Sequence, residues 1–244
     1  MLATRNLGLD IGGARIVADV SLEVRAGEFV GIIGPNGAGK TTLFNLLSGL
    51  ARPTAGSVEL AGRDVTGDPP FRRTRAGLGR TFQVSSVFPL LTVHENVRLA
   101  AEAAAGGSMR IWQRAAGRGG DRAAASLGRV GLGDRGAWPA GLLSHGDKRK
   151  LELAMLLSAD SSVILLDEPM AGVSVEDVAA LVELIRSVHA DGATVLMVEH
   201  RMEVVVGLAE RIAVMHHGAL LAFDEPDKVM ANETVQTAYL GEPL

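Results

Sequence analysis

Cysteine is absent from the 244-residue chain, which excludes disulfide scaffolds, zinc fingers, iron–sulfur clusters and thiol nucleophiles and agrees with a reducing compartment. An excess of positive charge is also lacking, because 24 Lys and Arg against 28 Asp and Glu leave a formal net charge of -4. A dedicated nucleic-acid binder depends on a clustered excess of Lys and Arg over the phosphates, so we expect no nucleic-acid partner.

Long hydrophobic runs are missing as well. Apolar runs such as 163–166 and 195–198 are far shorter than the roughly 20 residues that a helix needs to cross a bilayer. Residues 1–10 alternate polar and apolar types and do not read as a secretory signal. We therefore expect a cytoplasmic chain that reaches a membrane only through a partner. Its length suffices for one core that buries roughly 70–75% of the unfolded surface, alone or with a smaller lobe.

Short apolar runs alternate with helix-period stretches along the chain. This pattern is typical of an α/β protein with a largely parallel sheet covered by helices. Strands are predicted over residues 3–9, 16–24, 28–33, 57–60, 78–82, 163–166, 194–198, 211–216 and 219–224.

The middle of the chain differs, because it contains helical patterns without intervening strands. Helices are predicted over 93–105, 123–130 and 145–158, and the Gly-, Ala- and Arg-rich stretch 106–120 is predicted to be a loop or a short irregular helix. A further helix over 175–189 carries its apolar residues on one face and belongs to the core. The economical interpretation is a small helical lobe inserted into an α/β core.

A glycine-rich segment, GPNGAGKTT at 34–42, lies between an apolar strand pattern and a helical pattern, which is the setting of a phosphate loop. Its glycines let backbone N–H groups form a concave anion site, and the following helix contributes its positive N-terminal end. We expect Lys40 to reach the β- and γ-phosphates and the Thr41 hydroxyl to bind Mg²⁺. The alternative is a Gly-rich turn with an incidental lysine, which the strand-then-helix setting disfavours. The predicted nucleotide-binding residues are Gly34, Pro35, Asn36, Gly37, Ala38, Gly39, Lys40, Thr41 and Thr42.

Two carboxylates follow the apolar strand at 163–166, in the sequence VILLDEP. Ligands in open α/β sheets bind at the carboxyl ends of the strands, which is where these two residues fall. We expect Asp167 to hold Mg²⁺ through water and Glu168 to polarise the attacking water. Adjacent carboxylates after a strand are commonly only a solvated turn, but the phosphate loop elsewhere in the chain favours the functional interpretation.

Further motifs indicate which class of phosphate-loop protein this is. The NKxD guanine motif of Ras-type GTPases is absent, and residues 143–147 read LSHGD at the start of a helical pattern. This segment resembles the signature motif of ATP-binding-cassette (ABC) proteins. Other motifs of that family stand in the family's order, namely RTFQ ending at Gln83, AGVS at 171–174 and VEH ending at His200. The resemblance spans essentially the whole chain.

This resemblance implies the fold of an ABC ATPase in a single domain of residues 1–244. It adds an N-terminal antiparallel β portion to the mostly parallel core sheet. The α/β catalytic core would comprise residues 1–83 and 160–244, and the helical subdomain about 84–159. ATP and Mg²⁺ are the implied ligands, and hydrolysis of ATP to ADP and phosphate is the implied reaction.

The resemblance also gives roles to individual side chains near the phosphate loop. Gln83 is expected to contact Mg²⁺ or the attacking water, and His200 to hydrogen-bond the γ-phosphate. Together with Glu168 they form the predicted catalytic set. The predicted metal site consists of Thr41, Gln83 and Asp167.

The signature segment implies a partner, because in this family it contacts the nucleotide of a second ATP-binding subunit. Ser144, His145 and Gly146 are the residues expected to do so, and two nucleotides would be sandwiched between a homodimer or a pair of homologues. Ser144 also begins a helix, so capping is a second role that is compatible with the first.

Within the family, the chain resembles the ATP-binding subunits of branched-chain amino-acid and urea importers. The features that suggest this are FPLLTVHENV at 88–97, LSHG in the signature and the ending AYLGEPL. The implied partners are transmembrane permease subunits and, indirectly, a solute-binding protein, with the chain peripheral on the inner face of the membrane. Two alternatives stay open, a non-transport ABC ATPase acting on nucleic acid or ribosomes and an ATP-gated regulatory module.

Three positions depart from the family's pattern. Asp147 replaces the usual signature Gln, and Ser174 stands where an Asp is usual. In each case Ser-x-x-Asp fits a capping box that preserves the helix start. Ile11 occupies the place of an aromatic residue that stacks on adenine, in a chain with only 4% aromatic residues. We therefore expect weaker nucleotide-driven dimerisation and loose selectivity for the base.

The segment after Gln83 is the expected docking surface for a membrane subunit. It concentrates apolar residues beside a predicted catalytic contact, and about half of them are expected to be core of the lobe. These residues are Val84, Val87, Phe88, Leu90 and Leu91.

Overall fold

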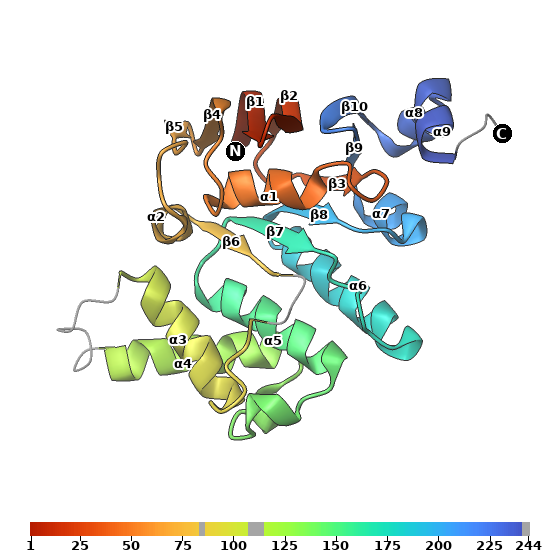
Figure 1. Cartoon of the computed structure of the whole chain (residues 1–244). Coiled ribbons are helices and arrows are strands. Elements are labelled where there is room, and N and C mark those ends of the chain that lie inside the picture. Colours follow the sequence, from red (N-terminus) through yellow and green to blue (C-terminus); the bar gives the residue numbers. More distant parts are fainter. Residues whose placement is uncertain (83–85, 107–114, 241–244) are drawn as a thin grey trace.

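A computed structural model describes residues 1–82, 86–106 and 115–240, and all structural statements refer to these residues. Their strands form two sheets in the upper part of the molecule, and the middle of the chain forms a helical unit below them (Figure 1). No helix in the described part of the chain is both long enough and apolar enough to cross a bilayer.

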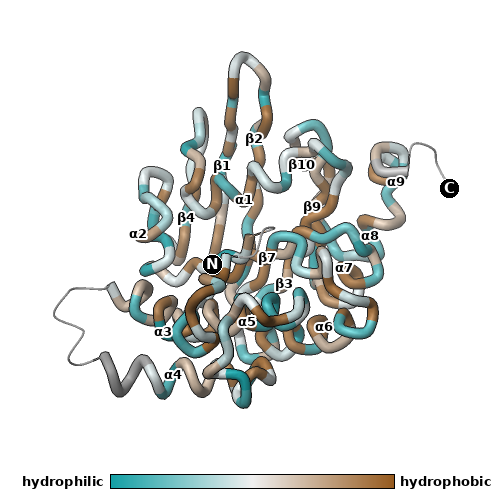
Figure 2. Tube along the Cα trace, turned by 60° about the horizontal axis from the view of Figure 1, so that its bottom comes forward, coloured by the Kyte–Doolittle hydropathy of each residue, from teal (hydrophilic) through white to brown (hydrophobic). Residues whose placement is uncertain are grey.

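The first sheet is antiparallel and has the strand order β2-β1-β4-β5. This is the N-terminal antiparallel portion that the sequence predicts, and its long β1–β2 hairpin protrudes from the body of the molecule (Figure 2). The strands are β1 (Leu2–Ile11), β2 (Ala14–Val24), β4 (Ala55–Leu60) and β5 (Arg63–Asp64).

The second sheet has the strand order β10-β9-β3-β8-β7-β6 and is parallel except for the β9–β10 hairpin at its edge. The predicted, mostly parallel core sheet is thereby confirmed. Its strands are β3 (Phe29–Ile33), β6 (Leu78–Arg80), β7 (Val163–Asp167), β8 (Thr194–Val198), β9 (Arg211–His216) and β10 (Ala219–Asp224).

Hydrophobic cores lie on both faces of the second sheet, because successive side chains of a strand point to opposite sides. Phe29 and Ile33 of β3 pack with residues of α3 to α6, whereas Val30 and Ile32 pack with α1 and the antiparallel sheet. The helices of the α/β part are α1 (Lys40–Ser48), α2 (Pro70–Arg75), α6 (Val175–Ala190), α7 (Met202–Leu208), α8 (Pro226–Met230) and α9 (Glu233–Leu240).

The helical unit consists of α3 (Val93–Ala104), α4 (Ala115–Arg129) and α5 (His145–Ser158), which contact one another, with short 3₁₀ turns at Gly133–Arg135 and Ala140–Leu142. The prediction of a loop or short irregular helix over 106–120 is wrong for residues 115–120, which form the first half of α4. Ala123 and Leu127 of α4 are fully buried. Their tertiary packing stabilises a helix whose glycine-rich first half has low intrinsic propensity.

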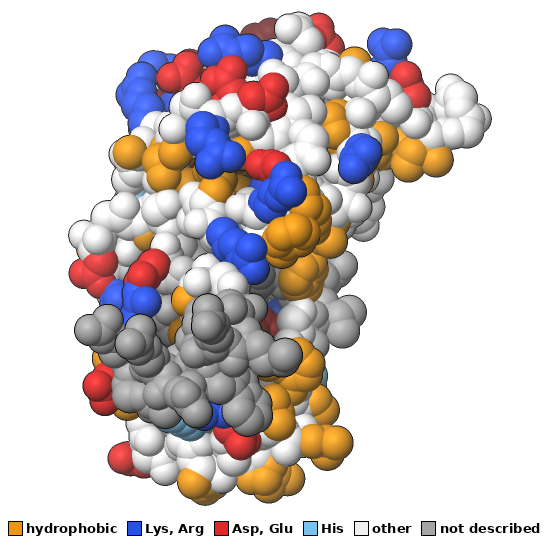
Figure 3. Space-filling view, turned by 90° about the vertical axis from the view of Figure 1, so that its left-hand side faces the viewer, with side chains coloured by type: hydrophobic (Ala, Val, Ile, Leu, Met, Phe, Trp, Pro, Cys, Tyr) orange, Lys and Arg blue, Asp and Glu red, His pale blue; other side chains and the backbone are white. Residues whose placement is uncertain are grey.

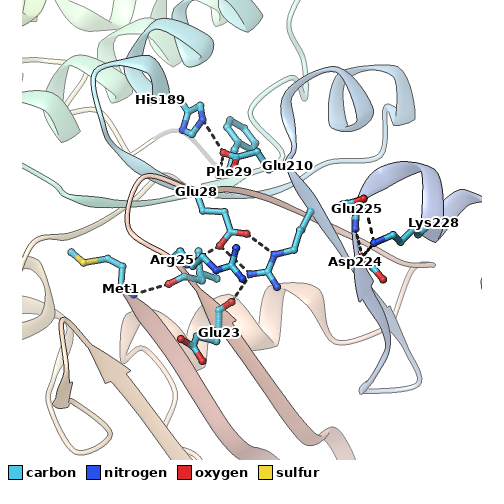
Figure 4. A network of polar contacts seen from close by, with 12 residues as sticks. Met1, Glu23, Arg25, Glu28, Phe29, His189, Glu210, Asp224, Glu225 and Lys228 are labelled. Atoms are coloured by element: carbon cyan, nitrogen blue, oxygen red, sulfur yellow. Dashed lines mark hydrogen bonds and ion pairs between the residues drawn. The ribbon is translucent and has the colours of Figure 1, made fainter.

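A polar network fixes the start of β3, at the end of the strand remote from the glycine-rich loop (Figure 4). The buried Glu28 carboxylate accepts hydrogen bonds from Arg211 Nη2 at 3.0 Å and from the Arg25 backbone N–H at 2.7 Å. Burial raises the pKa of Glu28, but these hydrogen bonds outweigh it and hold the pKa below its usual value. Arg211 also donates to the Glu23 carbonyl and thereby joins β9 to β2.

Candidate functional site

The glycine-rich loop connects β3 to α1, and two of its glycines have conformations that other residues rarely adopt. Gly34 has φ 151°, and an added Cβ would lie 2.1 Å from the Met215 carbonyl oxygen. Gly39 is the N-cap of α1 with φ 95°, and the cap makes no side-chain hydrogen bond to the helix. Gly39 therefore provides no side chain that would occupy the N–H groups in the first turn of α1. Uncapped N–H groups at a helix start suit a bound anion.

Lys40 lies across this loop with only 6% of its surface exposed. Its Nζ donates to the carbonyl oxygens of Gly34 at 2.7 Å and Pro35 at 2.9 Å. Burial lowers the pKa of Lys40, while the charges of Glu168 and Asp167 raise it by less. A desolvated ammonium beside bare backbone amides is chemically suited to phosphate oxygens.

A cavity of about 370 Å³ opens over the loop. The structure thus brings residues 36–42 of the predicted loop together with two side chains that lie far from them in the sequence, Glu168 and His200, whereas Gly34 and Pro35 do not line the cavity. The lining residues are Ile16, Asn36, Gly37, Ala38, Gly39, Lys40, Thr41, Thr42, Glu168 and His200.

Glu168 and His200 follow neighbouring strands of the parallel sheet and contact each other. His200 Nε2 lies 3.0 Å from Glu168 Oε1. The Glu168 backbone has φ 48°, a left-handed conformation that costs a non-glycine residue of order 1 kcal/mol or more. Its N–H donates to the Val198 carbonyl at 2.9 Å, which ties this conformation to the end of β8. Such strained residues concentrate at functional sites.

Asp167 ends β7 and is 2% exposed. Its backbone N–H donates to Thr81 Oγ1 at 3.2 Å, and its Oδ2 accepts from Arg80 Nη2 at 2.9 Å. Its Oδ1 is buried and has no hydrogen-bond partner among the described residues. A buried carboxylate oxygen without a partner is costly in isolation, so its presence points to a ligand.

The oxygen ligands available at this site fit Mg²⁺ better than a metal ion coordinated entirely by protein side chains. Mg²⁺ prefers oxygen ligands and is usually bound through one or two carboxylates, water and substrate phosphates. Asp167 and the cavity-lining Thr41 offer such oxygens, and no group of three His, Asp or Glu side chains in the described part of the chain is arranged to hold a metal. Gln83, the third predicted metal contact, lies outside the described residues.

The signature segment lies apart from the phosphate loop's own cavity, since none of the described residues that line that cavity belongs to it. Ser144 caps α5 and accepts from the Asp147 backbone N–H at 3.1 Å. In a capping box, the carboxylate of the third helix residue accepts a hydrogen bond from the backbone N–H of the N-cap residue. Here the Asp147 carboxylate instead accepts from Ser144 Oγ at 3.0 Å. An Asp side chain is one methylene shorter than the Glu of the usual box.

The Asp147 carboxylate is held by two cations of its own chain. It forms an ion pair with Arg135, and Lys150 Nζ lies 3.4 Å from its Oδ1. Burial raises the pKa of Asp147, but the hydrogen bonds from Ser144 and Arg135 outweigh it and leave the pKa below its usual value. Asp147 therefore stays ionised at neutral pH with its charge largely compensated.

The structure also shows the surroundings of the other two residues that depart from the family pattern, Ser174 and Ile11. Ser174 caps α6 by accepting from the Asp177 N–H at 3.3 Å, so this helix start is preserved as predicted. The starts of α5 and α6 touch, because an added Cβ at Gly146 would lie 2.9 Å from Asp177 Oδ2. Ile11 is 60% exposed on the β1–β2 hairpin and does not line the cavity.

Two residues at the site were not predicted from the sequence. Ile16, the third residue of β2, is a large apolar side chain that lines the cavity, and its place in the strand pattern carried no distinct signal. Arg80 pairs with Asp167 from β6. An arginine within an otherwise apolar strand pattern was the available clue, because charged residues are almost never fully buried unless paired.

A second cavity of about 380 Å³ lies at the remote end of the sheets and is lined in part by Arg5, Arg211 and Phe223. Both arginines are already engaged, Arg5 with Glu59 at 2.9 Å and Arg211 with Glu28. This cavity lacks the glycine-rich loop and the helix N-terminus that make the first one an anion site. The cavity over the loop is therefore the candidate functional site.

A phosphate loop between β3 and α1, with carboxylates at the end of the nearby β7, defines the chain as a phosphate-loop ATPase. A sequence profile of the ABC transporter family matches residues 17–171. The chain belongs to this family.

Relatives cover the whole chain. LivG of Salmonella typhimurium, a high-affinity branched-chain amino acid transport ATP-binding protein, is 38% identical in an alignment of 250 residues that covers 99% of this chain and 98% of LivG. The crystal structure of a nucleotide-free ATP-binding cassette from an ABC transporter superposes with a TM-score of 0.88 and 28% identity, covering 99% of both chains. A dimeric cassette in a post-hydrolysis state with ADP and Pi has a TM-score of 0.80 and 27% identity over 93% of this chain and 99% of its own.

Proposed function

We propose that this chain is the ATP-hydrolysing subunit of a membrane importer for branched-chain amino acids. The observation that carries the proposal is the Glu168–His200 pair in the cavity over the phosphate loop. The name of LivG supports the solute, because full-length similarity at 38% identity includes the regions outside the nucleotide site. Urea or short amides are the other solutes that the sequence resemblance suggests.

In the proposed reaction, the loop amides and Lys40 bind the phosphates of ATP. Thr41 and Asp167 would hold Mg²⁺, with Gln83 as a further contact, and the ion neutralises charge on the phosphates when bound. Glu168 Oε1 or Oε2 accepts the proton of the attacking water, and His200 orients the Glu168 carboxylate and hydrogen-bonds the γ-phosphate. Positioning and charge stabilisation supply most of the rate.

We propose that two chains close around two nucleotides. The signature residues Ser144, His145 and Gly146 lie outside their own chain's cavity, so a second subunit is the proposed receiver of their contacts. The dimeric cassette with ADP and Pi supports this arrangement. A homodimer and a pair with a homologous ATPase both satisfy it. In the same scheme, residues 1–83 and 160–244 act as the catalytic core and about 84–159 as the helical subdomain.

The proposed contact with the permease is the apolar surface at the start of the helical subdomain. Phe88 is 51% and Leu90 95% exposed, whereas Val87 and Leu91 are partly buried, and Val84 lies outside the described residues. Figure 3 shows one face of the molecule, with orange hydrophobic groups on its lower part and others beside Lys and Arg higher up. Docking there would place the chain at the membrane without a span of its own and link it indirectly to a solute-binding protein.

The proposal is tested by measuring ATP hydrolysis of the purified chain alone and after co-expression with permease subunits of a branched-chain amino-acid importer from the same genome. We expect a slow basal rate, co-purification with the permease, and a rate that rises when the cognate binding protein delivers its amino acid. Stimulation by nucleic acid or ribosomes would instead support a non-transport ATPase. ATP-driven association without turnover would support a regulatory module.

The charge of Asp147 is predicted to weaken dimer formation. In a Glu168→Gln background that retains ATP, an Asp147→Gln variant is expected to dimerise about two- to fivefold more strongly, because it removes a carboxylate and releases Arg135 beside the partner's phosphates. The effect is modest since Arg135 and Lys150 already compensate the charge. Light scattering during an ATP titration measures it. Asp134→Asn is the control, and equal dimerisation of all three proteins would contradict the prediction.

A further inference from the structure

Arg80 is a buried arginine whose role does not follow from the motifs. It is the last residue of β6, and its side chain is 5% exposed, beside an Asp167 side chain that is 2% exposed. Its Nη2 donates to Asp167 Oδ2 at 2.9 Å. Burying an ion pair gives little or no net stability, because desolvation of the two charges offsets their attraction. The pair therefore calls for an explanation other than stability.

The orientation of the Arg80 guanidinium is fixed from several sides. Nη1 donates to Asn45 Oδ1 and to Ser48 Oγ, both at 2.8 Å and both on α1. The guanidinium also lies over the rings of Phe44 and Phe82, at 5.6 and 5.0 Å from their centroids. These contacts connect the helix that follows the phosphate loop to the strand that ends at Asp167.

Because of Arg80, the two oxygens of the Asp167 carboxylate have different environments. Oδ2 is occupied by Arg80, whereas Oδ1 is buried and has no hydrogen-bond partner among the described residues. A carboxylate without this hydrogen bond would be free to rotate about its Cβ–Cγ bond. The hydrogen bond from the fixed Arg80 guanidinium determines which of the two oxygens is left for a ligand.

We propose that Arg80 is a positioning residue for Mg²⁺ in the nucleotide site, fixing the Asp167 carboxylate through Oδ2 so that Oδ1 is left for the ion or for a water bound to it. The inference rests on the proposed function, because it assumes that ATP binds with Mg²⁺ at the phosphate loop. Arg80 contacts neither the phosphates nor the reacting water in this scheme. Its effect passes through Asp167, as outer partners orient the ligands of other metal sites.

The test separates the affinity for ATP from the contribution of Mg²⁺ to that affinity. Binding of ATP to wild type and to Arg80→Gln is measured by titration calorimetry in excess Mg²⁺ and again in EDTA. In wild type, Mg²⁺ is expected to strengthen binding. In Arg80→Gln we expect this strengthening to fall about 10–100-fold, which is the usual effect of losing an outer partner of a metal ligand. The affinity in EDTA is expected to stay within about twofold, because the loop and Lys40 are untouched.

Arg73→Gln is the matched control. Arg73 is a second buried arginine that holds the end of α1, donating to the carbonyl oxygens of Leu46 and Leu47 at 2.7 Å, and it does not contact Asp167. If Arg80 were only a brace for α1, both variants would show the same Mg²⁺ dependence. We expect Arg73→Gln to lower the melting temperature and leave the Mg²⁺ effect at its wild-type value.

The outcomes are distinct. A folded Arg80→Gln with the wild-type Mg²⁺ effect would overturn the inference, as would an equal loss in Arg73→Gln. If a glutamine variant does not fold, Arg80→Lys and Arg73→Lys replace the pair, with a loss of at least about threefold expected only for Arg80→Lys because lysine cannot reproduce the planar fork. Failure of wild type to bind ATP in either buffer would refute the proposed function instead.

Discussion

A Glu168→Gln variant is expected to bind ATP as tightly as wild type and to lose about 10³-fold in its rate of hydrolysis, within the usual range for removal of a general base. The amide keeps the size of the side chain and its contact with His200 Nε2, but it cannot accept a proton from water. With hydrolysis blocked, the ATP-bound dimer should accumulate. Phosphate release measures the first effect, and size-exclusion chromatography with ATP the second.

Glu183→Gln is the control for this variant. Glu183 is an exposed residue of α6 that pairs with Arg186, so the same chemical change occurs outside the cavity. Hydrolysis and dimerisation are expected to match wild type. Steady hydrolysis by Glu168→Gln at more than about a tenth of the wild-type rate would remove Glu168 from the role of general base.

The parallel sheet explains why much of the site could be predicted from sequence. The apolar runs before Gly34 and Asp167 are long enough to be recognised as strands, and the carboxyl ends of parallel strands meet at one edge. His200 follows a third such run. Their meeting in one cavity is therefore a consequence of topology, and topology is encoded in the alternation of strands and helices.

Interactions between side chains of different elements were not predictable in the same way. The Arg80–Asp167 pair joins β6 to β7, and no local pattern states which carboxylate a buried arginine will meet. The Arg135–Asp147 pair was unpredictable for the same reason, because the sequence indicates only the helix-capping role of Asp147. The start of α4 at Ala115 was missed because the burial of Leu127 against the other helices outweighs the glycines before it.

A Lys40→Met variant is expected to remain folded and to bind ATP about 10²-fold more weakly. The ammonium is the buried charge of the loop, and charge-assisted hydrogen bonds to phosphate are each worth roughly 1.5–3 kcal/mol. Methionine nearly matches the volume of the lysine stem and needs no solvation, so the cost of burying the ammonium disappears with its two bonds to Gly34 and Pro35. The folded state without nucleotide should therefore be close to wild type in stability.

Thermal unfolding with and without ATP measures both effects at once. At an ATP concentration of about 100 times the wild-type Kd, wild type should gain about 2.7 kcal/mol, and a variant with a Kd 100 times higher about 0.4 kcal/mol. Lys228→Met, in α8 and 59% exposed, removes the same charge far along the chain from the loop and should keep the full gain. If Lys40→Met keeps it too, the phosphates are held by the backbone amides alone, and Lys40 serves only to close the loop through its bonds to Gly34 and Pro35.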